Sequence, residues 1–216
     1  MFSPTTWDTA TLGAKGLSIQ TPNIDALAEN GVRFTDFYNT ARCCPARARL
    51  LTGLYLHQAG IGGRSYVGDL DDHSATIAEV LKPAGYGTYM SGKWHLTYHK
   101  YCSPDGPKHS WPCQRGFDRF SGILGGSGSY SRPQDLREDS EPIEAEGDFY
   151  LTDAISDRAC DYNNDHAMSR PNDPWFLYVA YADPHWPLHA RPEDVSRYRG
   201  SYGAGWDMLR KQNTNG

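Results

Sequence analysis

The segment from Cys43 to Gly53, which reads Cys-Cys-Pro-Ala-Arg-Ala-Arg-Leu-Leu-Thr-Gly, combines residue types that suit chemistry on an anion. Pro45 predicts the first turn of a helix, because the N–H that proline lacks is one that the first turn leaves unpaired. Gly53 is placed to end that helix. Cys43 is therefore expected just ahead of a helix N-terminus, where backbone N–H groups and the helix dipole favour negative charge. With Arg47 in the next turn, the segment predicts a site for an anionic substrate and its adduct.

Polar side chains also follow two segments that predict β-strands. Residues 86–90 form one of them, and Lys93 and His95 come shortly after it. Residues 175–181 are nearly all apolar, as in a buried parallel strand, and His185 follows. Functional groups often lie where a strand gives way to a loop in α/β folds. One site is therefore expected to collect these three side chains and the helix start.

A helix and a short strand are expected ahead of the cysteines. Thr21 and Pro22 predict the helix start, and Gly31 its end. The stripe that this helix is expected to bury comprises Ile24, Leu27 and Ala28. Residues 32–37 form a β-like run that leads to the cysteines. A helix, a strand and a nucleophile at a helix start, in this order, indicate an α/β arrangement.

Two further helices carry start signals. Thr76 and Glu79 have the spacing of a capping box, and Pro83 and Gly85 close that helix. Its apolar face is expected to comprise Ile77, Val80 and Leu81. Thr152 is expected to cap a longer helix, whose first turn contains Asp153 and whose buried face comprises Ile155, Ala159 and Tyr162.

The remaining chain gives weaker signals. Residues 97–142 are expected to be mostly loop, and the glycine-rich run 122–128 lacks the spacing of a phosphate-binding loop. A last weak helix is expected over residues 206–210.

Composition restricts the class of protein. The chain has 216 residues, of which 38% are apolar and 22% charged, as in a folded globular domain. Its formal net charge of −5 argues against nucleic-acid binding, which normally leaves a basic footprint. The sequence has no apolar run long enough to predict a membrane span. The first residues, Met-Phe-Ser-Pro-Thr-Thr, lack the basic start and apolar core of a signal peptide.

The five cysteines allow two alternatives away from Cys43. Cys102 and Cys113 flank a loop and would be able to pair in an oxidising compartment, which the sequence does not establish. His99 and His109 lie near these cysteines, so the loop contains four zinc-compatible side chains. Their spacing lacks a Cys-x-x-Cys pair, and a zinc site is therefore not favoured.

The pattern Cys-x-Pro-x-Arg followed by Leu-Thr-Gly resembles the signature of the type I sulfatases, within the alkaline-phosphatase-like superfamily. Of the two adjacent cysteines, only Cys43 has proline two residues on and arginine four residues on. Other segments are similar to sulfatase landmarks in the family's order: Thr-Pro-Asn-Ile-Asp at 21–25, Gly-Val-Arg-Phe at 31–34, Gly-Lys-Trp-His-Leu at 92–96, Gly-Phe-Asp at 116–118, Tyr-Leu-Thr-Asp at 150–153 and Pro-His-Trp-Pro at 184–187. The resemblance implies an α/β fold with a central, mostly parallel mixed β-sheet flanked by helices on both faces.

The resemblance also implies roles for these residues. Cys43 would be oxidised after synthesis to formylglycine, whose hydrate is the nucleophile, and Arg47 would hold and activate that diol. Lys93 and His185 would bind the sulfate group, with His185 also placed to protonate the departing oxygen. His95 would deprotonate the diol in the second step, in which sulfate leaves. The implied partners are a sulfate ester substrate and a formylglycine-generating enzyme.

Lone motifs of these kinds are more often structural. A Lys-Trp-His sequence usually contains a surface lysine beside packing residues, and Pro-His-Trp-Pro usually forms a turn. Their occurrence with the cysteine signature favours the functional interpretation. Asp25 and Asp118 are expected to be structural carboxylates, and Arg49 a solvated helix arginine.

The implied metal is Ca²⁺ or Mg²⁺, which the family holds with an Asp-Asp pair after the first strand and an Asp-Asn pair further on. The family pattern, extended back from residue 21, places Thr5 and Thr6 at the first pair, with Asp8 the one carboxylate nearby. Cys43, as formylglycine, is the family ligand expected to remain. Residues 1–216 are accordingly interpreted as a partial sulfatase catalytic domain without its first strand and C-terminal portion, with an incomplete metal site.

Three functions follow from these observations. The leading hypothesis is hydrolysis of aryl or carbohydrate sulfate monoesters. The alternative within the superfamily is a phosphonate or phosphate monoester hydrolase, since some relatives also use formylglycine. A non-catalytic fragment that binds an oxyanion at the helix start is the third. The sequence does not specify the substrate or the compartment, although the resemblance implies export for many members.

Overall fold

The computed structural model describes residues 20–34, 38–40, 42–61, 68–200 and 203. These residues belong to two compact units. The described residues between 38 and 187 form the first unit, and residues 20–34 with 188–200 and 203 form the second. The first unit contains a β-sheet and all the predicted site residues, whereas the second contains two short helices, α1 (Pro22–Glu29) and α5 (Pro192–Arg197).

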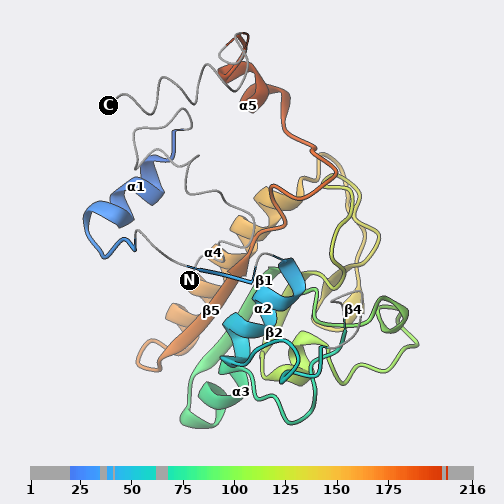
Figure 1. The fold of residues 1–216 in the computed structure, drawn as a ribbon. Coiled ribbons are helices and arrows are strands. Elements are labelled where there is room, and N and C mark those ends of the chain that lie inside the picture. Colours follow the sequence, from blue (N-terminus) through green and yellow to red (C-terminus); the bar gives the residue numbers. More distant parts are fainter. Residues whose placement is uncertain (1–19, 35–37, 41, 62–67, 201–202, 204–216) are drawn as a thin grey trace. The chain divides into compact units, whose positions relative to one another are not determined.

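A five-stranded mixed sheet organises the first unit, in the order β4-β3-β2-β1-β5 (Figure 1). The central strand β1 (Gly87–Lys93) pairs in parallel with β2 (Arg119–Ile123) and with β5 (Trp175–Ala180). The strands β3 (Leu136–Glu138) and β4 (Glu141–Pro142) add to β2 in antiparallel orientation. The three parallel strands end at one edge of the sheet, where the predicted polar residues follow. The expected mixed, mostly parallel α/β fold is confirmed.

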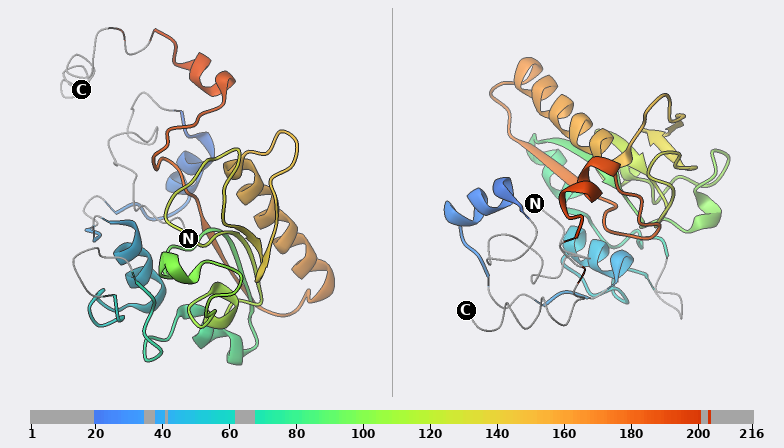
Figure 2. Two further views of the ribbon diagram at one scale, coloured as in Figure 1. Left: turned by 90° about the vertical axis from the view of Figure 1, so that its right-hand side faces the viewer. Right: turned by 90° about the horizontal axis from the view of Figure 1, so that it is seen from above.

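The helices α2 (Cys43–Thr52) and α4 (Leu151–Ser169) cover opposite faces of this sheet (Figure 2). On β1, Met90 packs in the same core cluster as residues of α2. The adjacent Ser91 donates from its hydroxyl to the Ile155 carbonyl oxygen of α4 at 2.8 Å. Because successive side chains of a strand point to opposite faces, the two helices lie on different faces. The expectation of helices on both faces is confirmed.

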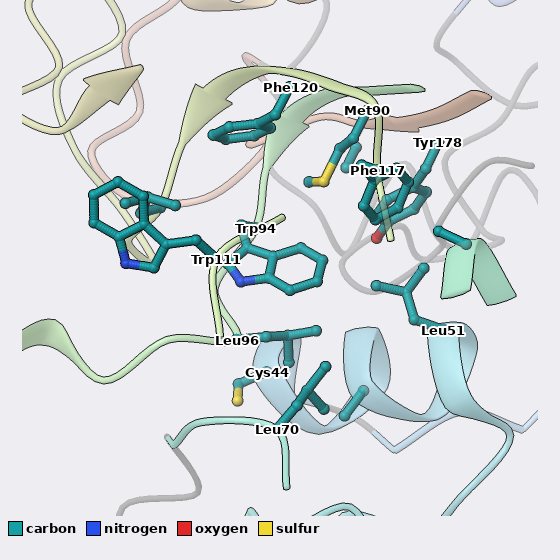
Figure 3. Packing of buried hydrophobic residues seen from close by; sticks show 14 of the residues in the cluster. Cys44, Leu51, Leu70, Met90, Trp94, Leu96, Trp111, Phe117, Phe120 and Tyr178 are labelled. Atoms are coloured by element: carbon teal, nitrogen blue, oxygen red, sulfur yellow. The ribbon is translucent and has the colours of Figure 1, made fainter. Parts of the chain in front are cut away.

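The larger hydrophobic core lies between α2 and the sheet (Figure 3). Trp94, directly after β1, is fully buried, and its indole N–H donates to the Ser110 carbonyl oxygen at 2.8 Å. The Phe117 ring meets the Trp94 ring edge-on, with centroids 6.1 Å apart. Leu51 of α2 packs in the same cluster. Trp94 therefore anchors the end of β1 between Lys93 and His95.

Two glycines allow the parallel strands to approach closely at this end. Gly92 has φ +119° and Gly122 has φ +151°, which side chains rarely adopt. A Cβ on Gly92 would overlap the Ala180 carbonyl oxygen, and a Cβ on Gly122 would overlap that of Gly92. The ends of β5, β1 and β2 are thus brought together just before Lys93.

The second unit departs from the predictions for its first helix. α1 starts at Pro22 with Thr21 as its N-cap residue, as predicted, but the Thr21 hydroxyl donates to the Asp25 carboxylate at 2.8 Å and makes no capping hydrogen bond. Asn30, not Gly31, follows the end of the helix. The predicted buried stripe is wrong, because no residue of α1 is buried and Leu27 is 60% exposed. A stripe of three residues on a helix this short is a weak signal, since packing partners decide burial.

The predicted strand over residues 32–37 is wrong where it is described. Residues 32–34 form no strand, and Val32 and Phe34 are exposed. Residues 35–37 and the predicted helix at 206–210 lie outside the described residues. The helix α5 was not predicted.

The helix α3 (Ile77–Leu81) has the predicted capping box: the Glu79 N–H donates to the Thr76 hydroxyl at 3.1 Å, and the Thr76 N–H to the Glu79 carboxylate at 2.7 Å. Its predicted apolar face is wrong, because Ala78 is its buried residue and Val80 is 60% exposed. The Thr76 hydroxyl also donates to the Arg115 carbonyl oxygen at 2.8 Å, which fixes how the helix is rotated. A 3₁₀ turn, Lys82–Ala84, continues to Gly85.

The prediction of mostly loop over residues 97–142 missed β2, β3 and β4, together with 3₁₀ turns at His99–Tyr101 and Pro112–Arg115. The sequence of β2, Arg-Phe-Ser-Gly-Ile, has little strand propensity, and pairing with β1 determines its conformation. The strand β1 also runs on past the predicted end at residue 90 to Lys93.

The helix α4 has the predicted buried face of Ile155, Ala159 and Tyr162. It begins at Leu151 with Tyr150 as its N-cap residue, so the predicted cap at Thr152 is wrong. The Thr152 hydroxyl donates to the Asp183 carboxylate instead, which ties α4 to the loop after β5.

The cysteines show neither a disulfide nor a zinc site. All five thiols are free, with Cys102 directed at the Tyr98 carbonyl oxygen and Cys113 at the Asp139 carboxylate. His109 pairs with the Asp69 carboxylate at 3.4 Å. Burial raises the pKa of the Cys102 thiol to about 11 and that of Cys113 to about 12, so both are protonated at neutral pH.

In the part of the chain that the structure describes, no helix combines the length and apolar character needed to cross a membrane.

Candidate active site

The start of α2 presents two cysteines in different surroundings. The helix begins at Cys43, so this residue lies in the first turn and not just ahead of it, and Gly53 ends the helix with φ +72° as predicted. Cys43 is partly exposed, whereas Cys44 is 1% exposed and packs in the core. Burial raises the pKa of the Cys44 thiol to about 11. Cys43 is therefore the more accessible of the two cysteines, and Cys44 is a core residue.

Arg47, one turn further along α2, is buried and connects the helix to the ends of two strands. One terminal nitrogen, Nη1, donates to the Lys93 carbonyl oxygen and to the Tyr178 hydroxyl, the latter at 3.3 Å. The other, Nη2, donates to the Tyr181 carbonyl oxygen at 3.1 Å. Its buried Nε has no hydrogen-bond partner among the described residues. Guanidinium has five N–H donors, so Arg47 keeps donors for a further acceptor.

Lys93 is the last residue of β1 and is 2% exposed. Burial, and next the positive charge of Arg47, lower the pKa of its ammonium to about 8, while the thiols of Cys43 and Cys44 oppose this shift. These interactions place Lys93 near Arg47 and the start of α2. A buried ammonium next to a guanidinium is unfavourable until an anion binds between them.

His95 adopts a left-handed backbone conformation, with φ +58°. Its N–H donates to the Leu124 carbonyl oxygen at 2.9 Å, which continues the pairing of β1 with β2. Burial lowers the pKa of its imidazole to about 3, helped by the positive charges of Lys93, Arg47 and His185. The ring is therefore neutral at physiological pH and able to accept a proton. Its buried Nδ1 has no hydrogen-bond partner among the described residues.

His185 follows β5 and is held by its own loop. Its Nδ1 lies 2.6 Å from the Trp186 carbonyl oxygen, and the Tyr130 hydroxyl donates to the His185 carbonyl oxygen at 2.9 Å. Because Nδ1 donates to a carbonyl, Nε2 is the nitrogen left for a ligand. His185 and His95 both line a hollow of about 210 Å³, whose other walls come from Thr97, His99, Gly125, Gly126 and Ser127.

The structure thus brings Arg47, Lys93, His95 and His185 together: besides burial, the charge of Arg47 lowers the pKa of Lys93, and the charges of Lys93, Arg47 and His185 lower the pKa of His95. The thiols of Cys43 and Cys44 also lie near Lys93. Arg49 lies outside this group: it is exposed, and its guanidinium stacks over the Tyr55 ring at 4.6 Å, as expected of a solvated helix arginine. Asp118 is structural as expected, since it pairs with Lys82 at 2.8 Å and accepts from the Thr88 N–H at 3.0 Å.

Three parts of the site were not predicted from the sequence. The Tyr178 hydroxyl and the Tyr181 carbonyl hold Arg47, and the Gly125–Gly126 turn lies against His95. The glycine-rich run had been noted, but its proximity to His95 depends on β2 pairing with β1, and β2 carries no clear signal.

The described residues do not fit a calcium or magnesium ion at this site. Hard cations need clustered carboxylate oxygens, and the groups that shift the pKa of Lys93 and His95 are cations, thiols and another histidine. Within the described ranges, no group of three or more His, Cys, Asp or Glu side chains has a geometry that would hold a metal. We therefore derive no catalytic step through a metal, and metal ligation by a Cys43-derived formylglycine stays a prediction.

The Cys-x-Pro-x-Arg segment at the start of α2 belongs to a chain that matches a known family. Residues 5–215 match the family model described as Sulfatase. The chain belongs to the sulfatase family. This family implies sulfuric ester hydrolysis, a divalent metal and a formylglycine.

Curated relatives share the sulfatase sequence over most of this chain. It is 33% identical over 227 residues to an uncharacterized sulfatase of Schizosaccharomyces pombe, covering 91% of the chain and 39% of that protein. It is 32% identical over 219 residues to an arylsulfatase of Klebsiella aerogenes, covering 91% of the chain and 45% of that protein.

Solved structures agree in fold. The crystal structure of Ps i-CgsB matches with a TM-score of 0.74 and 32% identity, covering 88% of this chain and 45% of that one. BT4656, in complex with its substrate D-glucosamine-2-N,6-O-disulfate, matches with a TM-score of 0.67 and 30% identity, covering 85% of this chain and 33% of that one. The chain thus spans less than half the length of each relative named here.

Proposed function

We propose that this chain contributes the nucleophile and the sulfate-binding groups of an enzyme that hydrolyses sulfate monoesters, and that residues 1–216 form part of its catalytic domain. The observation that carries the proposal is the buried pair of Arg47 and Lys93 beside Cys43. No carboxylate of the described residues is among the groups that shift the pKa of Lys93, and two buried cations in such surroundings are costly; an anion is the ligand that offsets this cost. A sulfate group has the charge and the oxygen acceptors for it.

Lys93 and His185 bind the sulfate oxygens in this proposal. Lys93 acts as a point charge, and a bound anion would raise its pKa from about 8, so that the ammonium stays charged during turnover. The Nδ1–H of His185 donates to the Trp186 carbonyl oxygen, so Nε2 is the nitrogen left for the substrate, and in the imidazolium form its N–H donates to a sulfate oxygen. From the rim of the hollow, His185 is also placed to protonate the departing alcohol oxygen.

Arg47 orients the nucleophile at position 43. Its terminal nitrogens are held by carbonyl oxygens from two strand ends, so the guanidinium is fixed before substrate binds. The unpaired Nε and the remaining Nη2 donor are available to an oxygen carried by residue 43. A formylglycine at this position, once hydrated, would supply a geminal diol as the nucleophile.

His95 takes a proton in the second half of the reaction. A base has to be unprotonated when it acts, and the low pKa of His95, about 3 without a bound anion, satisfies this condition. A bound sulfate would raise that pKa toward neutrality, which increases the basicity of the ring when it is needed.

Carbohydrate sulfates are the substrate class that we favour over aryl sulfates. The hollow next to His95 and His185 presents Thr97, His99 and Ser127, whose polar groups suit hydroxyls of a sugar ring. BT4656, which is 30% identical to this chain, was crystallised with a sulfated amino sugar as its substrate. The phosphonate and phosphate alternative is not carried forward, because the matching family model and both curated relatives are sulfatases.

The first test concerns Cys43 and its neighbour. The chain, with the residues that flank it in its gene, is produced together with a formylglycine-generating enzyme, and the peptide that contains Cys43 is analysed by mass spectrometry. We expect conversion of Cys43, which Cys43→Ala abolishes and the matched Cys44→Ala retains. A thiol that persists at Cys43, or conversion at Cys44, contradicts the proposal.

Turnover is then measured on the converted protein with 4-nitrophenyl sulfate and with glucosamine 6-sulfate. We expect both to be hydrolysed, the sugar sulfate with the higher kcat/KM, and Lys93→Ala to reduce kcat/KM by about 10²–10³-fold. Arg49→Ala is the matched control, since its guanidinium stacks on Tyr55 outside the site. Equal losses in the two variants would contradict the assignment of Lys93.

A further inference from the structure

The Gly125–Gly126 turn lies directly against the side chain of His95. A Cβ on Gly126 would overlap Nε2 and Cε1 of the imidazole and lie 2.9 Å from Cδ2. Gly125 and Gly126 also line the hollow with His95. The backbone of this turn therefore packs against the Nε2 side of the imidazole.

Hydrogen bonds do not fix the orientation of the His95 ring. Neither ring nitrogen has a hydrogen-bond partner among the described residues, and Nδ1 is buried. In contrast, the His95 backbone is fixed by its bond to the Leu124 carbonyl oxygen, one residue before the turn. The ring is therefore held by packing, and the turn is the backbone segment that packs on it.

Asp135 holds this turn in place. The Gly125 N–H donates to the Asp135 carboxylate, with 2.5 Å between nitrogen and Oδ2. A Cβ on Gly125 would lie 2.6 Å from the same oxygen, so the close approach requires a glycine. Burial raises the pKa of the Asp135 carboxyl, while the Gly125 N–H and then the positive charges of Arg137 and His99 oppose this effect. Burial outweighs these partners, and the pKa of the Asp135 carboxyl is raised above its ordinary value.

We propose that Asp135 is a positioning residue: through the Gly125 N–H it holds the Gly125–Gly126 turn against His95 and so sets the orientation of that imidazole. Asp135 touches neither the site cations nor the hollow. The inference rests on the proposed function only for the role of His95 as a base. The placement of the ring can be measured without any turnover.

The turn also covers part of the imidazole, which elsewhere lines the hollow. Burial is the largest cause of the low pKa of His95, and Lys93, Arg47 and His185 are the charged and titratable groups that face it. Asp135 is absent from the groups that shift it. If the turn is released, water reaches the imidazole and its pKa rises, whereas direct loss of a nearby negative charge would lower it. The sign of the change separates the two explanations.

The experiment is an NMR titration of the histidine side chains in the chain with ¹⁵N-labelled histidine, for the wild type and for Asp135→Ala. We expect His95 to stay neutral down to about pH 4 in the wild type and its pKa to rise by at least about one pH unit in Asp135→Ala. His166, on the other face of the sheet, is the internal reference. A pKa and ring shifts of His95 that are unchanged in a folded Asp135→Ala overturn the proposal.

Two more variants keep the test decisive if Asp135→Ala does not fold. Asp135→Asn keeps an oxygen that accepts from the Gly125 N–H, so we expect wild-type His95 signals. Gly126→Ala places a methyl group on the imidazole and is expected to shift the His95 ring signals without touching Asp135. Loss of the wild-type His95 signals in Asp135→Asn, or unchanged signals in Gly126→Ala, contradicts the proposal.

In the converted enzyme, Asp135→Ala is expected to lower kcat about tenfold with little change in KM, and Asp135→Asn to restore it. If the wild type itself has no sulfatase activity, the proposed function fails while the NMR result for Asp135 still stands.

Discussion

One histidine is buried on the face of the sheet covered by α4, another is half-buried just past the end of β1, and the two rings differ in their hydrogen bonds. On the face covered by α4, His166 Nδ1 lies 2.9 Å from the Tyr89 hydroxyl and Nε2 lies 3.0 Å from the Asp173 carbonyl oxygen. At the end of β1, neither nitrogen of His95 has a partner among the described residues. His166 is therefore satisfied by the fold, whereas His95 is satisfied only when something binds.

The buried arginines repeat this difference. Arg115 donates from all three nitrogens to the Glu79 carboxylate and to the carbonyl oxygens of Leu70, Asp71 and Ser74. Arg47 is equally buried but leaves Nε unpaired. Buried polar groups are nearly always hydrogen-bonded, so the exceptions need an explanation. Among the described residues, Arg47 Nε and His95 Nδ1 are two such exceptions at the candidate site, and Ser74 Oγ and two nitrogens of Arg137 are others away from it. The two at the candidate site lie among cations, where an anion would supply the missing acceptor.

The largest effect that we expect concerns Arg115, the buried arginine whose side-chain nitrogens all have hydrogen-bond partners. Arg115→Ala leaves a carboxylate and three carbonyl oxygens without their donor, so the free energy of unfolding should fall by about 3–5 kcal/mol. Urea denaturation measures it. The control is Arg119→Ala, a half-exposed arginine that pairs with Glu138 at 3.2 Å and whose loss should cost about 1 kcal/mol or less. Equal losses of unfolding free energy in Arg115→Ala and Arg119→Ala would show that the hydrogen bonds of Arg115 stabilise the fold no more than a half-exposed ion pair does.

Replacement of the buried Lys93 is expected to raise the free energy of unfolding, whereas replacement of Arg115 lowers it. Its folded pKa of about 8 lies below the ordinary 10.5, so between these values the unfolded chain binds the proton more tightly. The free energy of unfolding therefore rises with pH across this window. Lys93→Met should be more stable than the wild type below pH 8, by roughly 2–3 kcal/mol, and the difference should shrink toward pH 10.5.

Urea denaturation at pH 7 and pH 10 measures this difference. The control is Lys82→Met, because Lys82 is half-exposed and pairs with Asp118 at 2.8 Å, so its removal should cost a few tenths of a kcal/mol at both pH values. A Lys93→Met variant that is less stable than the wild type at pH 7 would show that Lys93 is paired within the fold.

Sulfate should distinguish the two histidine environments. An anion within about 4–6 Å raises the pKa of a cation by about one to three pH units, so sulfate should raise the pKa values of Lys93 and His95, whereas the NMR signals of His166 should not respond to it. NMR titrations with sulfate, and with sodium chloride at the same ionic strength, measure this. Shifts in all three residues would indicate a general salt effect, and no shift would argue against the anion site.

The smallest effect concerns one hydrogen bond on the α4 face. Tyr89→Phe removes the hydroxyl next to His166 and should lower the free energy of unfolding by about 1 kcal/mol, without changing the pKa of Lys93 or His95. Tyr55→Phe, at an exposed ring, should change it by less than about 0.5 kcal/mol. A change in the His95 signals of Tyr89→Phe would mean that the two faces are coupled.

The sequence predicted those parts of the fold that have local signals. The capping box at Thr76, the helix end at Gly53 and the buried face of α4 depend on a few neighbouring residues, and all are present. The strand β2 and the exposure of Leu27 depend on which partner packs against a segment, and there the local pattern was misleading.

The candidate site divides in the same way. Cys43, Arg47, Lys93, His95 and His185 could be proposed because each has a chemically suggestive neighbourhood in the sequence. The groups that hold them could not, because Tyr178 and Asp135 are ordinary residues whose relevance comes only from contacts across the fold. The residue types of a site indicate its chemistry, whereas the residues that hold it in position come from distant segments of the chain.

The hydrogen bonds of Arg47 also have a consequence for folding. They join residues that are 46 and 134 positions apart in the chain, so long loops must close before either can form. Contacts of such separation form late, because the entropy of loop closure is lost before the contact returns any energy. The anion site is therefore expected to be among the last parts of the first unit to assemble, and protection of the Lys93 and Tyr181 regions from hydrogen exchange would report that the chain has finished folding.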